Sequence, residues 1–96
     1  MDMEPELNNK QMQELFDAVA QLKSSAEAKQ FLRDLCTFSE LNAMAERWQV
    51  AQQINKKVPY RKIAQQTGSS TATITRVAHW IHHGMGGYKL LLSRKK

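Results

Sequence analysis

A chain of 96 residues, of which 42% are apolar, is long enough for one small globular domain and too short for two. It has no apolar run near the roughly 18 residues of a membrane helix, its lone Cys36 excludes an internal disulfide, and its acidic first residues lack the apolar stretch of a signal peptide. We therefore expect a cytoplasmic protein in a reducing compartment, without a membrane partner.

The charged residues are divided unevenly along the chain. Residues 1–55 carry nine acidic and five basic side chains, a net charge of −4, whereas residues 56–96 carry nine basic and no acidic ones, a net charge of +9. A long stretch without carboxylates attracts a polyanion such as nucleic acid. The alternative, a charged face that only keeps the protein soluble, would be served equally well by mixed signs. The pattern favours a nucleic-acid partner for the C-terminal half.

The first 55 residues have the apolar spacing of amphipathic helices. Apolar residues recur every three to five positions from Leu7 to Leu22, which predicts a helix over about residues 7–23. Ser24 with Glu27 forms a capping-box pattern, so a second helix follows it.

Thr37 and Glu40 repeat the capping-box pattern and predict a long third helix that ends near Asn55. Its inward face is predicted from the same spacing. That face comprises Leu41, Met44, Ala45, Trp48, Ala51 and Ile54.

Proline and glycine divide the basic half. Pro59 fits a first helical turn and predicts a fourth helix over about residues 59–67, which Gly68 ends. Ser69 or Ser70 caps a fifth helix that ends near His83, and a glycine-rich stop precedes a last helix from Tyr88. No strand alternation is present. The sequence predicts an all-α fold of six helices in a single domain over residues 1–96, with dimerisation helices over 7–55, a two-helix unit over 59–83 and a C-terminal helix over 88–96.

The two-helix unit over residues 59–83 has the pattern of a helix-turn-helix. In this motif two short helices pack at a steep angle, so that the second can enter the major groove of DNA. Ala64 supplies a small residue where the helices cross, and Gly68 supplies a left-handed turn four positions later. Branched apolar residues for the buried side are Ile63, Ile74 and Val77. The alternative is an ordinary helical hairpin.

If Ile74 and Val77 face the core, the opposite side of the fifth helix faces outward. Short side chains there let the helix approach bases and phosphates, and a cation follows them. A methyl group of Thr71 or Ala72 fits a thymine methyl, and Thr75 fits a base edge or a phosphate. The predicted DNA-binding residues are Arg61, Lys62, Ser70, Thr71, Ala72, Thr75, Arg76 and His79.

The fourth and fifth helices resemble the tryptophan-repressor family. The tract Ala-Thr-Ile-Thr-Arg over residues 72–76 matches the family's recognition-helix signature, with Gly68 at the matching turn. Gly86, Gly87 and Tyr88 resemble the Gly-Gly-Tyr of the short repressor-like branch. The resemblance covers roughly residues 30–83 in helix order. It implies an intertwined homodimer whose two recognition helices face successive major grooves.

The resemblance also implies an effector, tryptophan, held between two arginines. Arg47 and Arg76 fall at those positions once one gap is allowed between them. Directly after Arg76 the family has a small glycine, whereas this chain has Val77, which fills space that an indole would occupy. We therefore expect no cofactor, and either constitutive binding or a different ligand. The alternative is that Val77 is part of the helix-turn-helix core and Arg47 is a salt-bridge partner.

The sequence gives little support for metal binding or catalysis. His79, His82 and His83 lie at helical spacings that could seat two metal ligands, but no cysteine or carboxylate is near in sequence, so we expect no metal. No catalytic spacing is present, so we expect no enzyme.

The sequence therefore predicts a homodimeric, sequence-specific regulator of transcription, a repressor, that binds double-stranded DNA. A nonspecific nucleic-acid-binding protein and a helical adaptor acting through its acidic half remain as alternatives.

Overall fold

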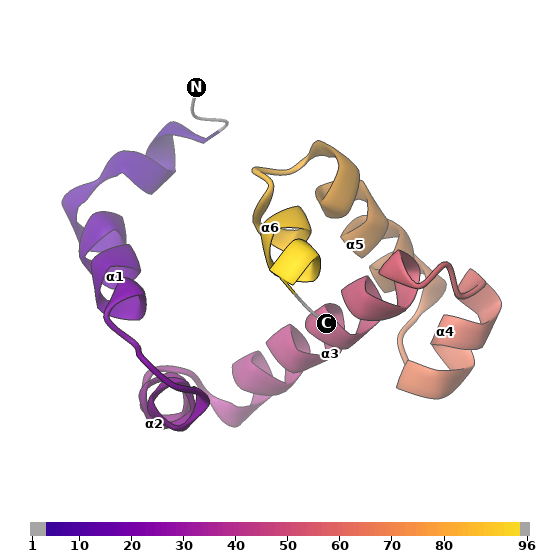
Figure 1. Cartoon of the computed structure of the whole chain (residues 1–96), viewed down its shortest axis with the longest axis horizontal. Helices are drawn as coiled ribbons and strands as arrows, with labels where there is room; N and C mark the ends of the chain where they lie inside the picture. Colours follow the sequence, from indigo (N-terminus) through magenta and orange to yellow (C-terminus); the bar gives the residue numbers. More distant parts are fainter. Residues whose placement is uncertain (1–3, 95–96) are drawn as a thin grey trace. The chain divides into compact units, whose positions relative to one another are not determined.

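The computed structural model describes residues 4–94, which form helices and no strands (Figure 1). This confirms the all-α prediction. The helices are η1 (Pro5–Asn8, 3-10), α1 (Lys10–Ala20), α2 (Ser25–Leu35), α3 (Phe38–Asn55), α4 (Tyr60–Thr67), α5 (Thr71–His83) and α6 (Gly87–Arg94). Among these helices, none has both the length and the apolar character of a membrane span. The chain divides after Leu41 into two compact units, each described by itself below.

The first helix differs from its prediction, because Asn9 interrupts the helix expected over residues 7–23. The Asn9 backbone is extended, and its side-chain amide donates a hydrogen bond to the Glu6 carbonyl oxygen at 2.9 Å. Its Oδ1 accepts a hydrogen bond from the Met12 N–H at 2.8 Å. Asn9 therefore caps the N-terminus of α1 and separates it from η1. The prediction of one continuous helix was wrong.

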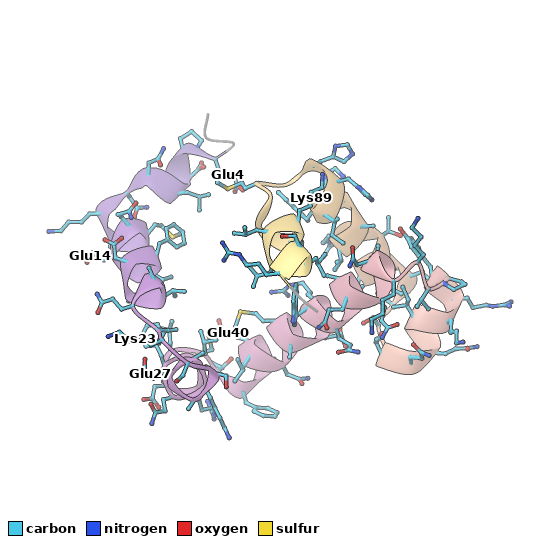
Figure 2. All side chains as sticks on the ribbon, viewed as in Figure 1. Glu4, Glu14, Lys23, Glu27, Glu40 and Lys89 are labelled. Atoms are coloured by element: carbon cyan, nitrogen blue, oxygen red, sulfur yellow. The ribbon has the colours of Figure 1, made fainter. Side chains whose placement is uncertain are left out.

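Both capping boxes of the N-terminal unit form as predicted (Figure 2 labels Lys23, Glu27 and Glu40). The Ser24 Oγ accepts from the Glu27 N–H at 3.1 Å, while the Glu27 carboxylate accepts from the Lys23 N–H at 2.9 Å.

At the start of α3, the Thr37 Oγ1 accepts from the Glu40 N–H at 3.1 Å, and the Glu40 carboxylate accepts from the Thr37 N–H at 2.8 Å. These reciprocal bonds satisfy amides that a helix start leaves unpaired, which is why the local pattern locates the boundaries.

The apolar stripes of the N-terminal unit are not buried. Neither η1, α1 nor α2 has a buried side chain among its residues. Phe16 is 44% exposed, Leu35 51% and Phe38 68%. The Arg33 guanidinium lies 6.0 Å from the centre of the Phe38 ring, which covers part of that ring with a cation. These helices have the composition of core helices without the corresponding burial.

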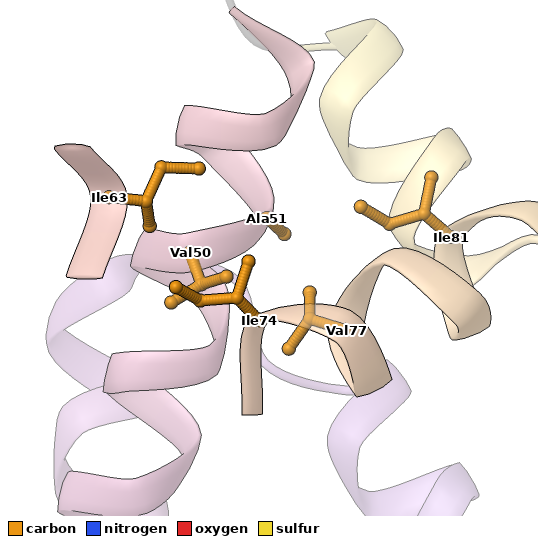
Figure 3. Close-up of a cluster of buried hydrophobic side chains, with 6 residues drawn as sticks. All are labelled: Val50, Ala51, Ile63, Ile74, Val77 and Ile81. Atoms are coloured by element: carbon orange, nitrogen blue, oxygen red, sulfur yellow. The ribbon is translucent and has the colours of Figure 1, made fainter. Parts of the chain in front are cut away.

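The core of the C-terminal unit joins three helices (Figure 3). Within it, α3 contributes Val50 and Ala51, and α4 contributes Ile63. From α5 come Ile74, Val77 and Ile81. Partly buried Trp48, Ile54, Val58, Ala64 and Tyr88 pack against this cluster.

The inward face predicted for α3 needs two corrections. Val50 is completely buried although the predicted stripe omitted it, and Ala45 is exposed although the stripe included it. The reason is that α3 meets both α4 and α5 near its C-terminus, so it is buried on more than one side there.

The end of α3 turns the chain toward α4. Lys57 has a left-handed backbone with a φ of 63°. Its N–H donates to the Ile54 carbonyl at 2.9 Å, and the Val58 N–H donates to the Gln53 carbonyl at 3.1 Å, the two bonds of a Schellman motif. Pro59 is the N-cap residue rather than the first helical residue, so α4 begins at Tyr60.

The predicted turn between α4 and α5 is present. Gly68 has a φ of 77°, and its N–H donates to the Ala64 carbonyl at 2.9 Å. An added Cβ would meet no atom within 4 Å there, so glycine is needed for its backbone conformation rather than for space. Ser70, and not Ser69, caps α5. The last helix begins at Gly87, one residue before its prediction, and residues 95–96 of the predicted 88–96 lie outside the described residues.

The adjacent serines of the turn should differ in their effect on stability. The Ser70 Oγ accepts from the Thr73 N–H at 3.1 Å, so Ser70→Ala is expected to lower the free energy of unfolding by about 1 kcal/mol. Ser69 is only 5% exposed, and its Oγ has no hydrogen-bond partner among the described residues. Ser69→Ala should therefore leave the stability unchanged or raise it slightly. Urea denaturation at one protein concentration measures both variants, and equal losses would contradict the assignment of the cap.

Candidate nucleic-acid interface

The two sides of α5 differ sharply in burial. Ile74 is completely buried and Val77 is 2% exposed, and both point into the core shown in Figure 3. The predicted reading residues Thr71, Ala72 and Thr75 are exposed, as are Arg76 and His79. This division follows from the 3.6-residue period of a helix that is packed along one side only. The orientation predicted for α5 is confirmed, while contact of its outer side with DNA stays a prediction.

The outer side of α5 forms a hollow of about 560 Å³. The five residues that line it are Thr71, Ala72, Thr75, Arg76 and His79. Their spacing places them on one face over two turns of the helix. The lining combines hydroxyl and methyl groups with a guanidinium and an imidazole, and it contains no carboxylate. Such a surface can make hydrogen bonds and methyl contacts to base edges and charged contacts to phosphate.

Ser70 has a structural role in this site. Its hydroxyl accepts from the Thr73 N–H and donates to the Thr73 Oγ1 at 3.1 Å. The predicted contact between Ser70 and DNA therefore competes with the hydrogen bonds that start α5.

Arg61 and Lys62 lie in the first turn of α4, and both are exposed. Pro59 precedes this turn and gives it no side-chain cap. Lys56 and Lys57, in the segment between α3 and α4, are also exposed. Arg61 and Lys62 were predicted to bind DNA from the sequence, whereas Lys56 and Lys57 were not, although they lie in the same stretch without carboxylates. The region concentrates positive charge at the entrance of α4.

A second hollow, of about 310 Å³, brings together the two arginines expected from the family resemblance. It is lined by Arg47, Arg76, Val77, Trp80 and Tyr88. Two guanidinium groups are able to pair with a carboxylate, and the aromatic side chains supply apolar walls. Val77 is almost entirely buried and belongs to the core of the helix-turn-helix, as one of the two interpretations of this residue predicted. Its branched side chain also forms part of the pocket wall.

Trp80 and Tyr88 were not predicted to line this pocket. Trp80 is 40% exposed. The Tyr88 ring stacks on the ring of Trp48 in α3, with centroids 6.3 Å apart and planes inclined by 3°. The Gly-Gly-Tyr tract drew attention to Tyr88 in the sequence. Its stacking partner, Trp48, is known only from the packing of α6 against α3.

The histidines of α5 lie near one another. The ring centroids of His79 and His83 are 5.0 Å apart, and those of His82 and His83 are 6.5 Å apart. Among residues 4–94, no cluster of three or more His, Cys, Asp or Glu side chains has an arrangement that could hold a metal ion. His79, which lines the outer hollow, also meets Trp80 edge-on, with ring centroids 5.8 Å apart.

Comparison with known proteins agrees with this geometry. A family model described as Trp repressor protein matches residues 10–96. The uncharacterised protein YerC of Bacillus subtilis is 38% identical over 90 residues, which are 94% of this chain and 86% of that protein.

Two solved structures are similar throughout. A TrpR-like protein from Eubacterium eligens is 35% identical, with a TM-score of 0.89 over 95% of this chain and 94% of that one. A protein from Staphylococcus aureus, described as a candidate Trp repressor, is 39% identical, with a TM-score of 0.89 over 97% of this chain and 94% of that one.

The buried and exposed sides of α5, the left-handed glycine before it and the match over residues 10–96 lead to one conclusion. The chain belongs to the Trp repressor protein family, a family of DNA-binding regulators, and has that family's all-helical fold.

Proposed function

We propose that this protein is a sequence-specific transcriptional repressor that acts in the cytoplasm as a homodimer, without catalytic activity, and binds double-stranded DNA through α4 and α5. The observation that carries the proposal is the orientation of α5, whose Ile74 and Val77 are buried while Thr75 and Arg76 face outward. The absence of acidic residues from the sequence after position 55 supports it, because a duplex repels carboxylates.

The exposed residues divide into two roles. Arg61 and Lys62 bind backbone phosphates and set the register of the protein on the duplex. Thr71 and Ala72 offer methyl groups to thymine, and Thr75 offers a hydroxyl to a base edge. Occupation of the site then blocks access of the transcription machinery, which is repression by occlusion.

A homodimer would explain the exposed apolar side chains of the N-terminal unit. Its helices are amphipathic but have no buried side chains, and Phe16, Val19 and Leu35 are each more than two-fifths exposed. Apolar stripes of this kind are stable in water when another surface covers them. A second copy supplies that surface, and the dimer presents two copies of α5 to half-sites about 34–36 Å apart.

DNA binding by this protein requires no tryptophan. In support, the pocket that Arg47 and Arg76 line is also lined by Trp80 and Tyr88, and branched Val77 forms part of its wall. The chain's own aromatic side chains thus line the space where an indole would lie. Binding is constitutive in this proposal.

A charge placed on the outer side of α5 tests the DNA interface. Thr75→Asp puts a carboxylate among the reading residues and is expected to lower the affinity for a selected operator by about 100-fold or more, through lost base contact and phosphate repulsion. Ser39→Asp adds the same charge in the N-terminal unit and serves as the matched control. Fluorescence anisotropy with labelled duplex measures both variants.

Three outcomes separate the proposal from its alternatives. The proposal requires a wild-type preference for the operator over bulk DNA at matched salt, which Thr75→Asp removes. Equal affinity for operator and bulk DNA would identify a nonspecific nucleic-acid-binding protein. An absence of DNA binding by the wild type would leave the adaptor and exclude the repressor.

The dimer makes stability depend on concentration. The melting temperature should rise when the protein concentration is raised 100-fold, because folding and association are coupled. Phe16→Glu, on the exposed apolar stripe of α1, should shift sedimentation toward the monomer and lower the melting temperature. Gln11→Glu, which adds the same charge at an exposed polar position of α1, is the control. A monomer with concentration-independent melting would contradict the proposal.

Added tryptophan should change neither the melting temperature of the protein nor its operator affinity. A ligand present at about 100 times its dissociation constant stabilises the folded state by about 2.7 kcal/mol, which raises the melting temperature by several degrees. Differential scanning calorimetry with millimolar tryptophan is expected to show no such rise, and operator affinity should not change. A clear rise would mean that the pocket accepts the indole despite Val77.

A further inference from the structure

We propose that Tyr88 is a positioning residue for DNA reading: its stack on Trp48 forms a clamp that joins α6 to α3 and orients Arg76 on α5. This inference rests on the proposed function, because it concerns how the same reading surface is held.

The clamp links α3, which precedes α5 in the sequence, to α6, which follows it. Trp48 lies in α3 and Tyr88 in the first turn of α6, and their rings are parallel within 3° at a centroid distance of 6.3 Å. This is the geometry of offset stacking, which aromatic pairs favour. Both rings also pack against the core cluster to which α5 contributes Val77 and Ile81. The stack therefore closes one side of the core that supports α5.

Besides the stack, α6 packs against α5, but few of its side chains are buried. Leu92 is its one buried residue among those described, while Leu90 and Leu91 are each 48% exposed. The connection from α5 to α6 contains Gly86, whose φ of 90° favours glycine. It begins at Gly84, where an added Cβ would collide with the Trp80 carbonyl oxygen. The path of the chain thus returns α6 to α5, and the Tyr88 stack secures the start of α6.

Arg76 connects the clamp to the reading surface. Its side chain lines the outer hollow together with Thr71 and Thr75, and it also lines the inner pocket together with Tyr88. One side chain therefore borders both spaces. Tyr88 and Trp80 line the same pocket as Arg76, and in this proposal their rings limit the orientations open to its guanidinium. A guanidinium held in one orientation loses less conformational entropy when it binds a base edge.

Substitutions that separate the ring from its hydroxyl test the clamp. Tyr88→Phe keeps the stacking surface, so its operator affinity should stay within about twofold of the wild type. Tyr88→Leu keeps an apolar side chain without a ring, and its operator affinity should fall about tenfold. Its affinity for bulk DNA and the salt dependence of that affinity should not change, because phosphate contacts of Arg61 and Lys62 remain. Met85→Ala, an exposed neighbour outside the stack, is the control for the connection.

A double-mutant cycle identifies Trp48 as the partner. If the two rings act as one unit, Trp48→Leu with Tyr88→Leu should lower operator affinity no more than either substitution alone. Losses that multiply would show two independent effects and overturn the clamp. Circular dichroism confirms that each variant keeps its helix content, so that unfolding is not mistaken for lost positioning.

A measurement without DNA separates this inference from the proposed function. The ¹⁵N relaxation of the Arg76 Nε–H in the free protein should indicate an ordered side chain in the wild type and in Tyr88→Phe, and a mobile one in Tyr88→Leu. Equal mobility in all three would overturn the clamp, whatever the DNA measurements show. A wild type without operator preference but with an ordered Arg76 that loosens in Tyr88→Leu would instead reject sequence-specific reading and retain the clamp.

Discussion

The packing of Ile74 and Val77 against Val50, Ala51 and Ile63 determines most of what this protein presents to its surroundings. These aliphatic side chains hold α5 against α3 and α4, and removing a large one from such a core typically costs about 2–5 kcal/mol. Because a helix has a fixed period and α5 is packed along one side, the opposite side, which carries Thr71, Thr75 and Arg76, is exposed. The surface proposed to read DNA is therefore a consequence of the core behind it.

The two units of the chain differ in how they bury apolar side chains and in their surface charge. The C-terminal unit buries a small aliphatic core and has a surface without carboxylates beyond position 55, which suits a polyanion. The N-terminal unit has well-capped helices whose apolar side chains stay exposed. Capping stabilises the ends of these helices but does not cover their stripes. This contrast is the reason for assigning DNA binding to one half and self-association to the other in the proposed function.

Arg76 belongs to two environments, which gives it a central place in the proposed mechanism. It borders the outer hollow with the threonines of α5 and the inner pocket with Arg47, Trp80 and Tyr88. In the proposed mechanism, a change in the pocket therefore acts on the DNA-binding surface without movement of a whole domain.

The amino-acid sequence by itself determined the features that depend on near neighbours. Ser24, Thr37 and Gly68 act through hydrogen bonds or backbone conformations within a few residues, so their patterns located helix ends correctly. The period of α5 likewise indicated its buried and exposed sides. At Asn9 the apolar spacing gave the wrong helix boundary. The spacing continues through this residue, but the Asn9 Oδ1 accepts a hydrogen bond from the Met12 N–H and starts a new helix.

Only the tertiary structure decided the features that join distant segments. Val50 is buried because α3 meets two helices at once, whereas a periodic pattern indicates a single stripe. The stack of Trp48 on Tyr88 joins residues 40 positions apart, and no local spacing encodes such a contact. The shared pocket of Arg47 and Arg76 was implied by family resemblance, but its aromatic walls depend on how α6 returns to α5. Packing between helices depends on the shapes of both partners, and this is the information that a one-dimensional pattern lacks.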